Sequence, residues 1–314
     1  MAKTFNRRTA LAFGAATLSA PYIARAASVT LRVGTYRGQD ETLLPLAGES
    51  STPYRVQYFE FTSGQLIIEA MNGGALDYGG WSEIPQAFAA ASKAQVRAVA
   101  VLKGDVNNQV VLVPKASPVT NIAGLKGKRV GYVRATTSHY YLLRMLWQAG
   151  LDFSDIQAIN LDPTNGAAAF SAGDLDAWAI YGYSIQEALA AGQARVLRTA
   201  NGILSGNYLL GASPAALRDP GLRPAVADYV ARVSRAYAWS ETHKHEWETA
   251  LAATIQVKPD YVRAQLEHES QPDRVVPVDE AAIASAQAVA DTFAKVGLLP
   301  HGTDVSGYFD TSLI

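Results

Sequence analysis

The sequence carries the same short pattern twice, and this duplication constrains the fold more than any other feature. Residues 31–38 (LRVGTYRG) resemble residues 128–135 (KRVGYVRA), and their shared glycines lie 97 positions apart. A second pair of segments, 74–77 (GALD) and 173–176 (GDLD), recurs at a spacing of 99. A repeat of this length is too long for a solenoid period, so the sequence predicts two similar α/β lobes of about a hundred residues each.

In the second copy, the pattern predicts a strand, a turn and a helix. Residues 128–133 are β-branched and aromatic, residues 135–138 form a small polar turn, and residues 140–148 place apolar side chains at helical spacing. Hydroxyl residues at a helix start either cap the helix or border an anion site, because free backbone N–H groups and the positive end of the helix dipole lie there. Arg134, just before the turn, is either a countercharge or a solvated surface residue.

A glycine and aromatic turn follows the second duplicated segment in both copies. It covers residues 79–84 (GGWSEI) in the first copy and residues 181–186 (YGYSIQ) in the second. Each turn leads into a predicted helix. If the two lobes face one another, each therefore contributes helix starts to a shared cleft.

Strands alternate with helices of about ten residues along both copies, which predicts an α/β fold with parallel-rich sheets flanked by helices. Ligands in such sheets bind outside the carboxyl ends of the strands. Residues 114–118 are the expected crossing to the second lobe, residues 208–214 the expected return, and the helices after residue 224 are expected to pack on the first lobe. The predicted division is 27–113 with 213–314 for lobe 1, and 114–212 for lobe 2.

The first 26 residues are predicted to be an export signal. Arg7 and Arg8 precede a modestly apolar run, and an Ala-x-Ala site ends at Ala26. The paired arginines indicate the twin-arginine route, although Ala10 stands where a large apolar residue is usual. The apolar run is too short to span a bilayer, so no retained anchor is expected.

The charge balance and the absence of cysteine exclude several classes of function. Without residues 1–26 the chain has 23 basic and 28 acidic residues and no basic run, which argues against a nucleic-acid partner. There is no cysteine, so the chain has no disulfide, no thiol nucleophile and no thiolate metal site. His243 and His245 lie on different faces of a predicted helix, which favours a solvated surface over a metal site. We expect no metal and no cofactor.

Four further stretches resemble the periplasmic solute-binding proteins of ABC importers, in the sulfonate, taurine and nitrate branch and in particular the aliphatic sulfonate-binding proteins. These stretches are 60–74 (EFTSGQLIIEAMNGG), 121–130 (NIAGLKGKRV), 137–151 (TSHYYLLRMLWQAGL) and 173–180 (GDLDAWAI). The resemblance implies a type II, two-lobed venus-flytrap receptor, each lobe a mixed sheet flanked by helices. It further implies a monomer in the periplasm that delivers its ligand to a permease and ATPase complex and serves transport and sulfur metabolism.

The expected ligand is a small organic anion, a sulfonate or a carboxylate analogue. A sulfonate has three acceptor oxygens and no donor, so it is best held by N–H groups, hydroxyls and a guanidinium. Aromatic residues at turns and strand ends can wall the pocket for an apolar or flat group. The candidate ligand-binding residues are Tyr36, Arg37, Gly38, Thr62, Ser63, Gly80, Trp81, Ser82, Arg134, Thr136, Thr137, Ser138, Tyr181, Tyr183 and Asn207.

Two segments differ from the sulfonate-binding branch, and both bear on the organic group of the ligand. Tyr181-Gly182-Tyr183 replaces a usual Trp-Asp-Pro, and Trp81 stands where small residues are usual. The number of aromatics indicates a bulky or aromatic ligand. Trp81 and Tyr183 either contact that ligand or pack in the core, whereas Trp147 and Trp178 are expected in the core.

Two other functions remain open on the sequence. Some relatives in this fold are enzymes, a desulfinase and a thiamine-pyrimidine synthase, but both need cysteine, which this chain lacks. Motifs of hydrolases, metalloproteases and phosphate-binding loops are also missing, so we expect no enzyme. The same fold can also report a ligand to a membrane receptor, and the sequence leaves this sensor alternative open.

Overall fold

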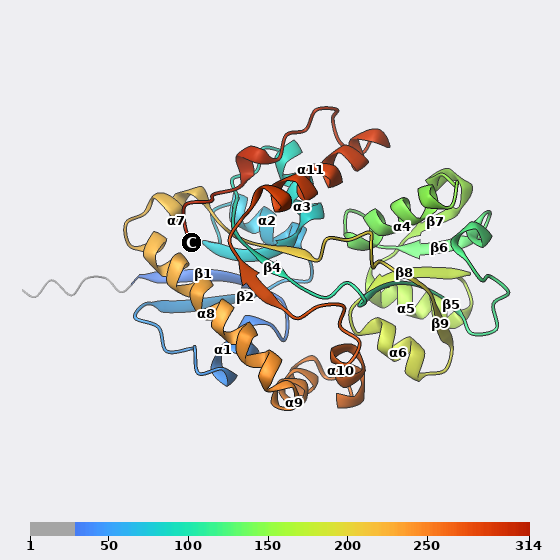
Figure 1. The fold of residues 1–314 in the computed structure, drawn as a ribbon, viewed down its shortest axis with the longest axis horizontal. Helices are drawn as coiled ribbons and strands as arrows, with labels where there is room; N and C mark the ends of the chain where they lie inside the picture. Colours follow the sequence, from blue (N-terminus) through green and yellow to red (C-terminus); the bar gives the residue numbers. More distant parts are fainter. Residues whose placement is uncertain (1–28) are drawn as a thin grey trace, which may run out of the picture.

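The computed structural model describes residues 29–314, so the predicted export signal, residues 1–26, lies outside the described residues. Figure 1 shows two bodies side by side, each built on one sheet with helices packed on it. No helix within residues 29–314 combines the length and the apolar character that a membrane crossing needs.

The first sheet is mixed and has six strands. In spatial order they are β11 (Arg274–Val276), β4 (Arg97–Lys103), β10 (Asn207–Ala212), β3 (Tyr78–Ser82), β1 (Thr30–Thr35) and β2 (Arg55–Glu60). β1 is parallel to β2 and β3, whereas β10 is antiparallel to β3 and β4, and β11 is antiparallel to β4.

The second sheet repeats this arrangement with five strands. In spatial order they are β7 (Gln157–Asn160), β6 (Arg129–Tyr132), β8 (Ala177–Tyr181), β5 (Gln109–Pro114) and β9 (Ala194–Thr199). β6 is parallel to β7 and β8, and β5 is antiparallel to β8 and β9. The strands β6, β7 and β8 therefore correspond to β1, β2 and β3, and the predicted α/β duplication is confirmed.

Helices connect and cover both sheets. Those of the first body are α1 (Asp40–Leu46), α2 (Gly64–Asn72), α3 (Glu83–Ala91), α7 (Pro214–Arg218), α8 (Leu222–Thr242), α9 (Lys244–Ile255), α10 (Pro259–Leu266) and α11 (Glu280–Lys295). Those of the second body are α4 (Thr137–Gln148), α5 (Pro163–Ala172) and α6 (Ser184–Ala190). Short 3-10 helices are η1 (Ile122–Leu125), η2 (Phe153–Asp155) and η3 (Ser306–Tyr308). Aliphatic and aromatic residues of α8 pack on β1, β4 and β10 in one core, and α4 packs on β5, β6 and β8 in another.

The duplication extends to individual atoms. Arg32 at the start of the first copy donates from Nη2 to Asp77 Oδ1 at 2.6 Å, and its backbone N–H donates to Oδ2 of the same carboxylate. Arg129 makes the same two bonds to Asp176, with Nη2 to Oδ1 at 3.0 Å. Each arginine also donates to the carbonyl of the glycine three residues before its aspartate. This ion pair fixes the turn before β3 and β8 onto the strand beside it.

The crossings between the two bodies lie earlier than the sequence analysis expected. β5 (Gln109–Pro114) pairs with β8 and β9, so the chain crosses between residues 103 and 109 and not at residues 114–118. β10 (Asn207–Ala212) pairs with β3 and β4, so the return lies between residues 199 and 207. Both strands are apolar runs, and an apolar run alone does not specify the sheet that will pair with it.

The helices after residue 224 do more than pack on the first body. α8 packs on the first sheet as expected, but residues 274–276 add the strand β11, and α10 contacts α6 of the second body. Tyr183, at the start of α6, joins a small apolar cluster with Leu251 of α9 and Val262 of α10. In Figure 1, α10 accordingly lies between α9 and α6. This segment therefore bridges the two bodies.

A second contact between the bodies involves α11 and α4. The Phe293 ring packs 5.2 Å from the His139 ring and 6.0 Å from the Tyr140 ring, centroid to centroid. Lys295 lies over the Trp147 ring, so Trp147 is half-buried at this contact and not a core residue. Burial, followed by the charge of Arg134, lowers the pKa of His139 to about 4, so this ring is neutral at physiological pH.

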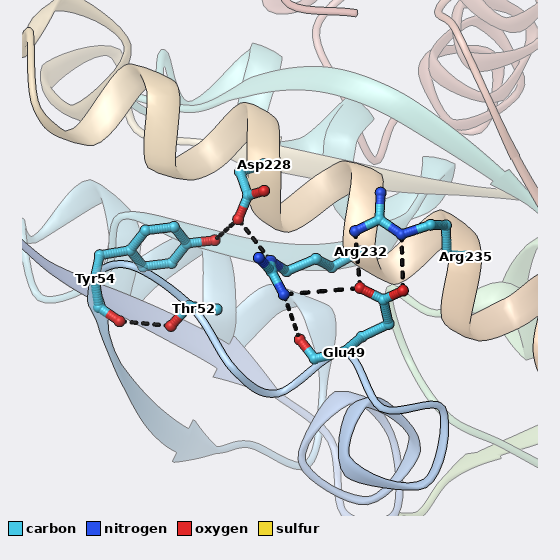
Figure 2. A network of polar contacts seen from close by, with 6 residues as sticks. All are labelled: Glu49, Thr52, Tyr54, Asp228, Arg232 and Arg235. Atoms are coloured by element: carbon cyan, nitrogen blue, oxygen red, sulfur yellow. Dashed lines mark hydrogen bonds and ion pairs between the residues drawn. The ribbon is translucent and has the colours of Figure 1, made fainter.

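A polar network ties the loop after α1 to α8, as Figure 2 shows. The Arg235 guanidinium donates to both Glu49 carboxylate oxygens at 2.7 Å. Arg232 donates to the Glu49 carbonyl and to Asp228, which also accepts the Tyr54 hydroxyl at 2.7 Å. The loop that follows α1 is thereby held against α8.

Candidate functional site

A cavity of about 360 Å³ lies between the two bodies. The first body contributes the turn between β1 and α1, parts of β3, β4 and β10, and side chains of α8, α9 and α10. The second body contributes the turn between β8 and α6, while Asn108 comes from the crossing segment. Both bodies therefore wall the cavity, at the carboxyl ends of the parallel strands β1 and β8, where ligands of α/β sheets bind.

The turn between β1 and α1 is shaped by Gly38. Its backbone φ of +78° is in the left-handed region, which a glycine adopts without strain. A Cβ at this position would lie 2.6 Å from a methyl carbon of Leu251 in α9. The glycine therefore permits both the turn and the close approach of α9, which closes this side of the cavity.

Tyrosines form much of the cavity wall. Tyr36 donates its hydroxyl to the Gly80 carbonyl at 3.0 Å, and Tyr181 and Tyr208 lie near it. Tyr183 faces this group from the start of α6. Burial raises the pKa of all four phenols above the ordinary value, so each remains a neutral donor at physiological pH. These rings present faces and hydroxyls to a ligand.

The cavity is also acidic. Its lining includes four carboxylates, Asp40, Asp105, Glu269 and Asp273, and one cationic side chain, Arg37, which is exposed. Burial raises the pKa of Asp40 to about 6, although the Tyr229 hydroxyl bonded to it opposes the shift. Burial and the nearby acids, first Glu269, raise the pKa of Asp273 to about 7.

Three buried polar atoms that border this cavity have no hydrogen-bond partner within residues 29–314. They are the Tyr78 hydroxyl, Asn108 Oδ1 and Gln265 Oε1. Buried polar groups are nearly always paired in native proteins, because an unpaired one costs about 1–3 kcal/mol. These three atoms, however, expose almost no surface to the cavity, so a molecule bound there does not reach them.

The start of α4 lies beside the Tyr181 edge of this cavity. Thr136 is close to the Tyr181 hydroxyl, and Thr137 donates to Gln109, whose amide in turn donates to the Tyr208 hydroxyl. No side chain caps the helix, because the Thr136 and Ser138 hydroxyls bond the Val133 carbonyl instead. The first backbone N–H groups of α4 are thus available to an acceptor.

Arg134 precedes this helix start. Its side chain is exposed, and within residues 29–314 its guanidinium forms no hydrogen bond or salt bridge, although its backbone N–H donates to Asn160. Free amides and a free guanidinium on one side of the cavity can hold an anion.

The start of α3 was expected to offer a second set of donors to an anion, but it carries a buried carboxylate of the chain itself. Glu83, the first residue of α3, is buried and accepts hydrogen bonds from Asn207, Ser205 and Ser285 at 2.6–3.0 Å. Burial raises its pKa in spite of these bonds. Asn207 is therefore occupied within the protein.

The fifteen sequence-predicted residues fall into three groups. Those that line the large cavity are Tyr36, Arg37, Gly38, Gly80, Trp81, Tyr181 and Tyr183. Those that border a much smaller neighbouring cavity are Ser82, Thr137 and Asn207. Those outside both are Thr62, Ser63, Arg134, Thr136 and Ser138. Within this last group, Thr62 is exposed and Ser63 caps α2 by accepting the Leu66 N–H.

Trp81 borders the cavity, but its side chain is completely buried. The indole N–H donates to Gln86 Oε1 at 2.6 Å, and a Cβ at Gly211 would lie 2.2 Å from the Trp81 ring. These contacts favour packing over ligand contact, the second of the two roles that the sequence left open. Trp178 is also buried, as expected.

Several residues of the cavity wall were not predicted from the sequence. Asp40 lies two residues after the duplicated segment, but an acid in the first turn of a helix is explained by the helix dipole alone. Gln265, Glu269 and Asp273 lie more than two hundred residues further on, and only the packing of α9 and α10 brings them to the site. No local pattern in the sequence signals that packing.

Residues 29–314 contain no group of three or more His, Cys, Asp or Glu side chains arranged to hold a metal ion.

Comparison with known proteins gives consistent matches. The profile of the family described as NMT1/THI5 like matches residues 55–206. An aliphatic sulfonates-binding protein of Escherichia coli is 32% identical over 280 residues, which cover 88% of this chain and 86% of that protein. The solved structure of the periplasmic aliphatic sulphonate binding protein SsuA from Escherichia coli has a TM-score of 0.81 at 30% identity, covering 89% of this chain and 91% of that chain.

A further solved structure, the alkanesulfonate-binding protein SsuA from Xanthomonas axonopodis pv. citri bound to MOPS, has a TM-score of 0.82 at 30% identity. The alignment covers 91% of this chain and 99% of that chain.

Proposed function

The chain belongs to the family of the aliphatic sulfonate-binding proteins, and from that premise we propose that it captures an organic sulfonate between its two lobes and delivers it to an ABC importer. The observation that carries this proposal is the cavity walled by both lobes, with the uncapped start of α4 beside it. The lobes are residues 29–103 with 207–314, and residues 109–199, joined by the two crossings.

The sulfonate group binds at the start of α4. Its oxygens accept from the free N–H groups of the first helical turn, and the Arg134 guanidinium supplies a countercharge. Thr136 and Thr137 set the shape of this turn through their bonds to Val133 and Gln109. Because a sulfonate has no donor, a site made of donors discriminates against groups that also need acceptors.

The organic part of the ligand lies in the tyrosine-walled cavity. A volume of about 360 Å³ accommodates a ring or a branched chain and is larger than a short alkyl group needs. Tyr36 and Tyr208 contact the ligand from lobe 1 and Tyr181 and Tyr183 from lobe 2, so a bound molecule holds the two lobes together. That closed form is the one presented to the permease.

This assignment is to a receptor and not to an enzyme. The relatives that are at least 30% identical over most of the chain are binding proteins, and the chain has no cysteine to serve as a nucleophile. Two further parts of the proposal rest on the sequence alone. Residues 1–26 direct export through the twin-arginine route, and the protein acts as a monomer in the periplasm.

Thermal shift and calorimetry with purified protein lacking residues 1–26 test the proposal. A sulfonate at a hundred times its Kd stabilises the folded state by about 2.7 kcal/mol, which raises Tm by roughly 5 °C or more. The matched control is the methyl ester of the same sulfonic acid, which keeps the organic group and loses the charge. If no sulfonate shifts Tm, or if ester and anion bind equally, the proposal is wrong.

A further inference from the structure

The side chain of Gln109 joins the two lobes beside the cavity. Its carboxamide oxygen accepts the Thr137 hydroxyl at 2.6 Å, and its carboxamide nitrogen donates to the Tyr208 hydroxyl oxygen at 3.3 Å. Thr137 is the first residue of α4 in lobe 2, whereas Tyr208 belongs to β10 in lobe 1. One amide therefore connects the helix start that faces the anion with a wall of the cavity in the other lobe.

The fold leaves Gln109 little freedom. It is the first residue of β5, it lies opposite Tyr181 in the sheet, and its backbone carbonyl accepts the Ala200 N–H at 2.8 Å. The residue is only 3% exposed. A buried amide that loses its partners is costly, so the folded protein keeps both side-chain hydrogen bonds. The carboxamide is thus a fixed reference point for the two hydroxyls bonded to it.

The two hydrogen bonds determine where each hydroxyl hydrogen goes. A phenol oxygen that accepts an N–H directs its own hydrogen to another acceptor. Within residues 29–314 no protein acceptor takes the Tyr208 hydrogen, although Tyr208 borders both the large and the small cavity. Thr137, by contrast, gives its hydrogen to Gln109. The amide therefore selects Tyr208, and not Thr137, as the hydroxyl that donates to a ligand.

Neighbouring hydroxyls are already used within their own lobes. Thr136 and Ser138 both bond the Val133 carbonyl, at 2.7 and 3.3 Å. Tyr36, the other lobe 1 tyrosine close to Tyr181, donates to a backbone carbonyl of β3 at 3.0 Å. Of these two lobe 1 tyrosines, Tyr208 is therefore the one that keeps its hydrogen for a ligand.

We propose that Gln109 is a positioning residue for the sulfonate, because it orients the Tyr208 hydroxyl as a donor to one sulfonate oxygen. The other sulfonate oxygens accept from the first amides of α4, so both lobes hold the same anionic group. Gln109 and Tyr208 directly follow the two crossings, where lobes that close about a hinge move least, so this donor is oriented before the ligand binds. The inference rests on the proposed function for the position of the sulfonate.

A double-mutant cycle tests the inference by titration calorimetry with hexanesulfonate and benzenesulfonate, on the protein lacking residues 1–26. In the otherwise wild-type protein, Tyr208→Phe should weaken binding about tenfold, because a hydrogen bond to a charged group is lost. In the Gln109→Met variant, the same change should cost about threefold or less, since the hydroxyl is no longer directed. A residue that serves only the fold would leave the cost of Tyr208→Phe unchanged.

Gln86→Met is the matched control. Gln86 is also a buried glutamine that bridges two groups, because it accepts the Trp81 indole N–H at 2.6 Å and donates to the Tyr308 carbonyl at 3.4 Å. Both of its partners lie in lobe 1, so Tyr208→Phe should keep its full cost in this variant. If that cost is the same in the Gln109→Met and Gln86→Met proteins, the inference is wrong.

The Thr137→Val variant gives a second test that leaves Gln109 in place, and it decides the matter if Gln109→Met does not fold. Thr137 and Tyr208 share no hydrogen bond and belong to different lobes. Loss of the Thr137 hydroxyl frees one end of the amide, so Tyr208→Phe should then cost at least about threefold less than in the wild-type protein. Additive effects of the two changes on affinity would contradict a connection through Gln109.

The two proposals fail in different ways. If the wild-type protein binds no sulfonate, the proposed function fails and the inference fails with it. If it binds a sulfonate and Tyr208→Phe leaves the affinity unchanged, the protein remains a sulfonate receptor and only the role of Gln109 is wrong. An equal, large loss from Tyr208→Phe in every variant would mean that Tyr208 donates without direction from Gln109, which also overturns the inference.

Discussion

The two copies of the duplicated segment share one structural frame, by which we mean the strand order and the arginine–aspartate pair. They differ in charge where they meet the cavity. Arg32 bonds Asp77, and Arg129 bonds Asp176, through the same pairs of atoms. After the turn, however, the first copy starts its helix with acids, Asp40 and Glu41, whereas the second starts with hydroxyls and no acid in the first turn. The same backbone plan therefore offers a carboxylate in one lobe and free amides in the other.

This difference shows how a duplicated scaffold can bind a ligand that is itself not symmetric. Strand order and the arginine–aspartate pair maintain the frame, so they are alike in both lobes. The residues that follow the strands are free to differ, because the frame does not depend on them. In lobe 1 they place acids at the start of the helix, and in lobe 2 they leave hydroxyls and free amides there. The four predictions below test this separation of frame from site, from the largest effect to the smallest.

The largest effect is expected at the two buried tryptophans of the frame. Trp81→Ala should lower the free energy of unfolding by about 3–5 kcal/mol, because a fully buried indole is lost. Urea denaturation measures this loss. Trp81→Phe should still destabilise by leaving Gln86 unpaired, whereas Trp178→Phe removes an indole N–H that has no partner and should cost less. A selective loss of affinity for bulky ligands, with stability unchanged, would instead place Trp81 in the site.

The paired aspartates should come next. Asp77→Ala leaves Arg32 without its partner and should lower the free energy of unfolding by about 2–3 kcal/mol, less than for a fully buried pair because Arg32 is partly exposed. Asp176→Ala should cost less, since that carboxylate is 35% exposed and Asp77 only 3%. Chemical denaturation of both variants gives the comparison. Equal losses would mean that solvent does not distinguish the two copies.

Asp273, an acid in the cavity wall, should reveal itself in the pH dependence of the free energy of unfolding. The folded-state pKa of Asp273 is raised to about 7, so the folded protein binds a proton that the unfolded chain has lost above pH 4. This group therefore favours folding as pH falls from about 7 to about 4. Asp273→Asn should raise stability at pH 7.5 by about 1–2 kcal/mol and flatten the slope in that window.

Asp228→Asn is the control for this measurement, because its effect has the opposite sign. Burial tends to raise the pKa of Asp228, but the bonds from Arg232 and Tyr54 outweigh it and hold the pKa below its ordinary value. Its loss should therefore destabilise the protein at neutral pH. If Asp273→Asn also destabilises at pH 7.5, that carboxylate serves the frame.

The smallest effect is expected at the two arginines that occupy equivalent places in the duplication. Arg134→Ala should weaken sulfonate binding about threefold to tenfold and change stability by less than about 0.5 kcal/mol, because the side chain is exposed and unpaired. Arg37→Ala should leave sulfonate affinity nearly unchanged, since Arg37 lies in the wall with the acids. Titration calorimetry compares them. A larger loss at Arg37 would place the anion at the opposite end.

The sequence predicted the frame well because the frame is local and repeated. Period-two strands, helix starts and the recurring Gly-x-Leu-Asp segment all lie within short windows, so the order of most elements followed. The crossings were misplaced because β5 and β10 are apolar runs that fit either sheet. The strand β11 was missed because it has three residues and lies among helices.

The site was only half predictable for a related reason. Tyr36, Tyr181 and Tyr183 lie at or just after the ends of strands, so their place at the cavity could be expected. Asp273 and Gln265 depend on the packing of α9 and α10 across the cleft, which no local pattern encodes. Glu83 shows the converse, because a helix start that was expected to hold an anion carries a buried acid that binds Asn207 and Ser205.

The most direct test of the central claim is a crystal structure of the protein with a bulky organic sulfonate. We predict one molecule in the cavity between the lobes, with sulfonate oxygens on the first amides of α4 and the organic group among Tyr36, Tyr181 and Tyr183. A ligand bound elsewhere, or one whose sulfonate points toward Asp40 and Asp273, would contradict it.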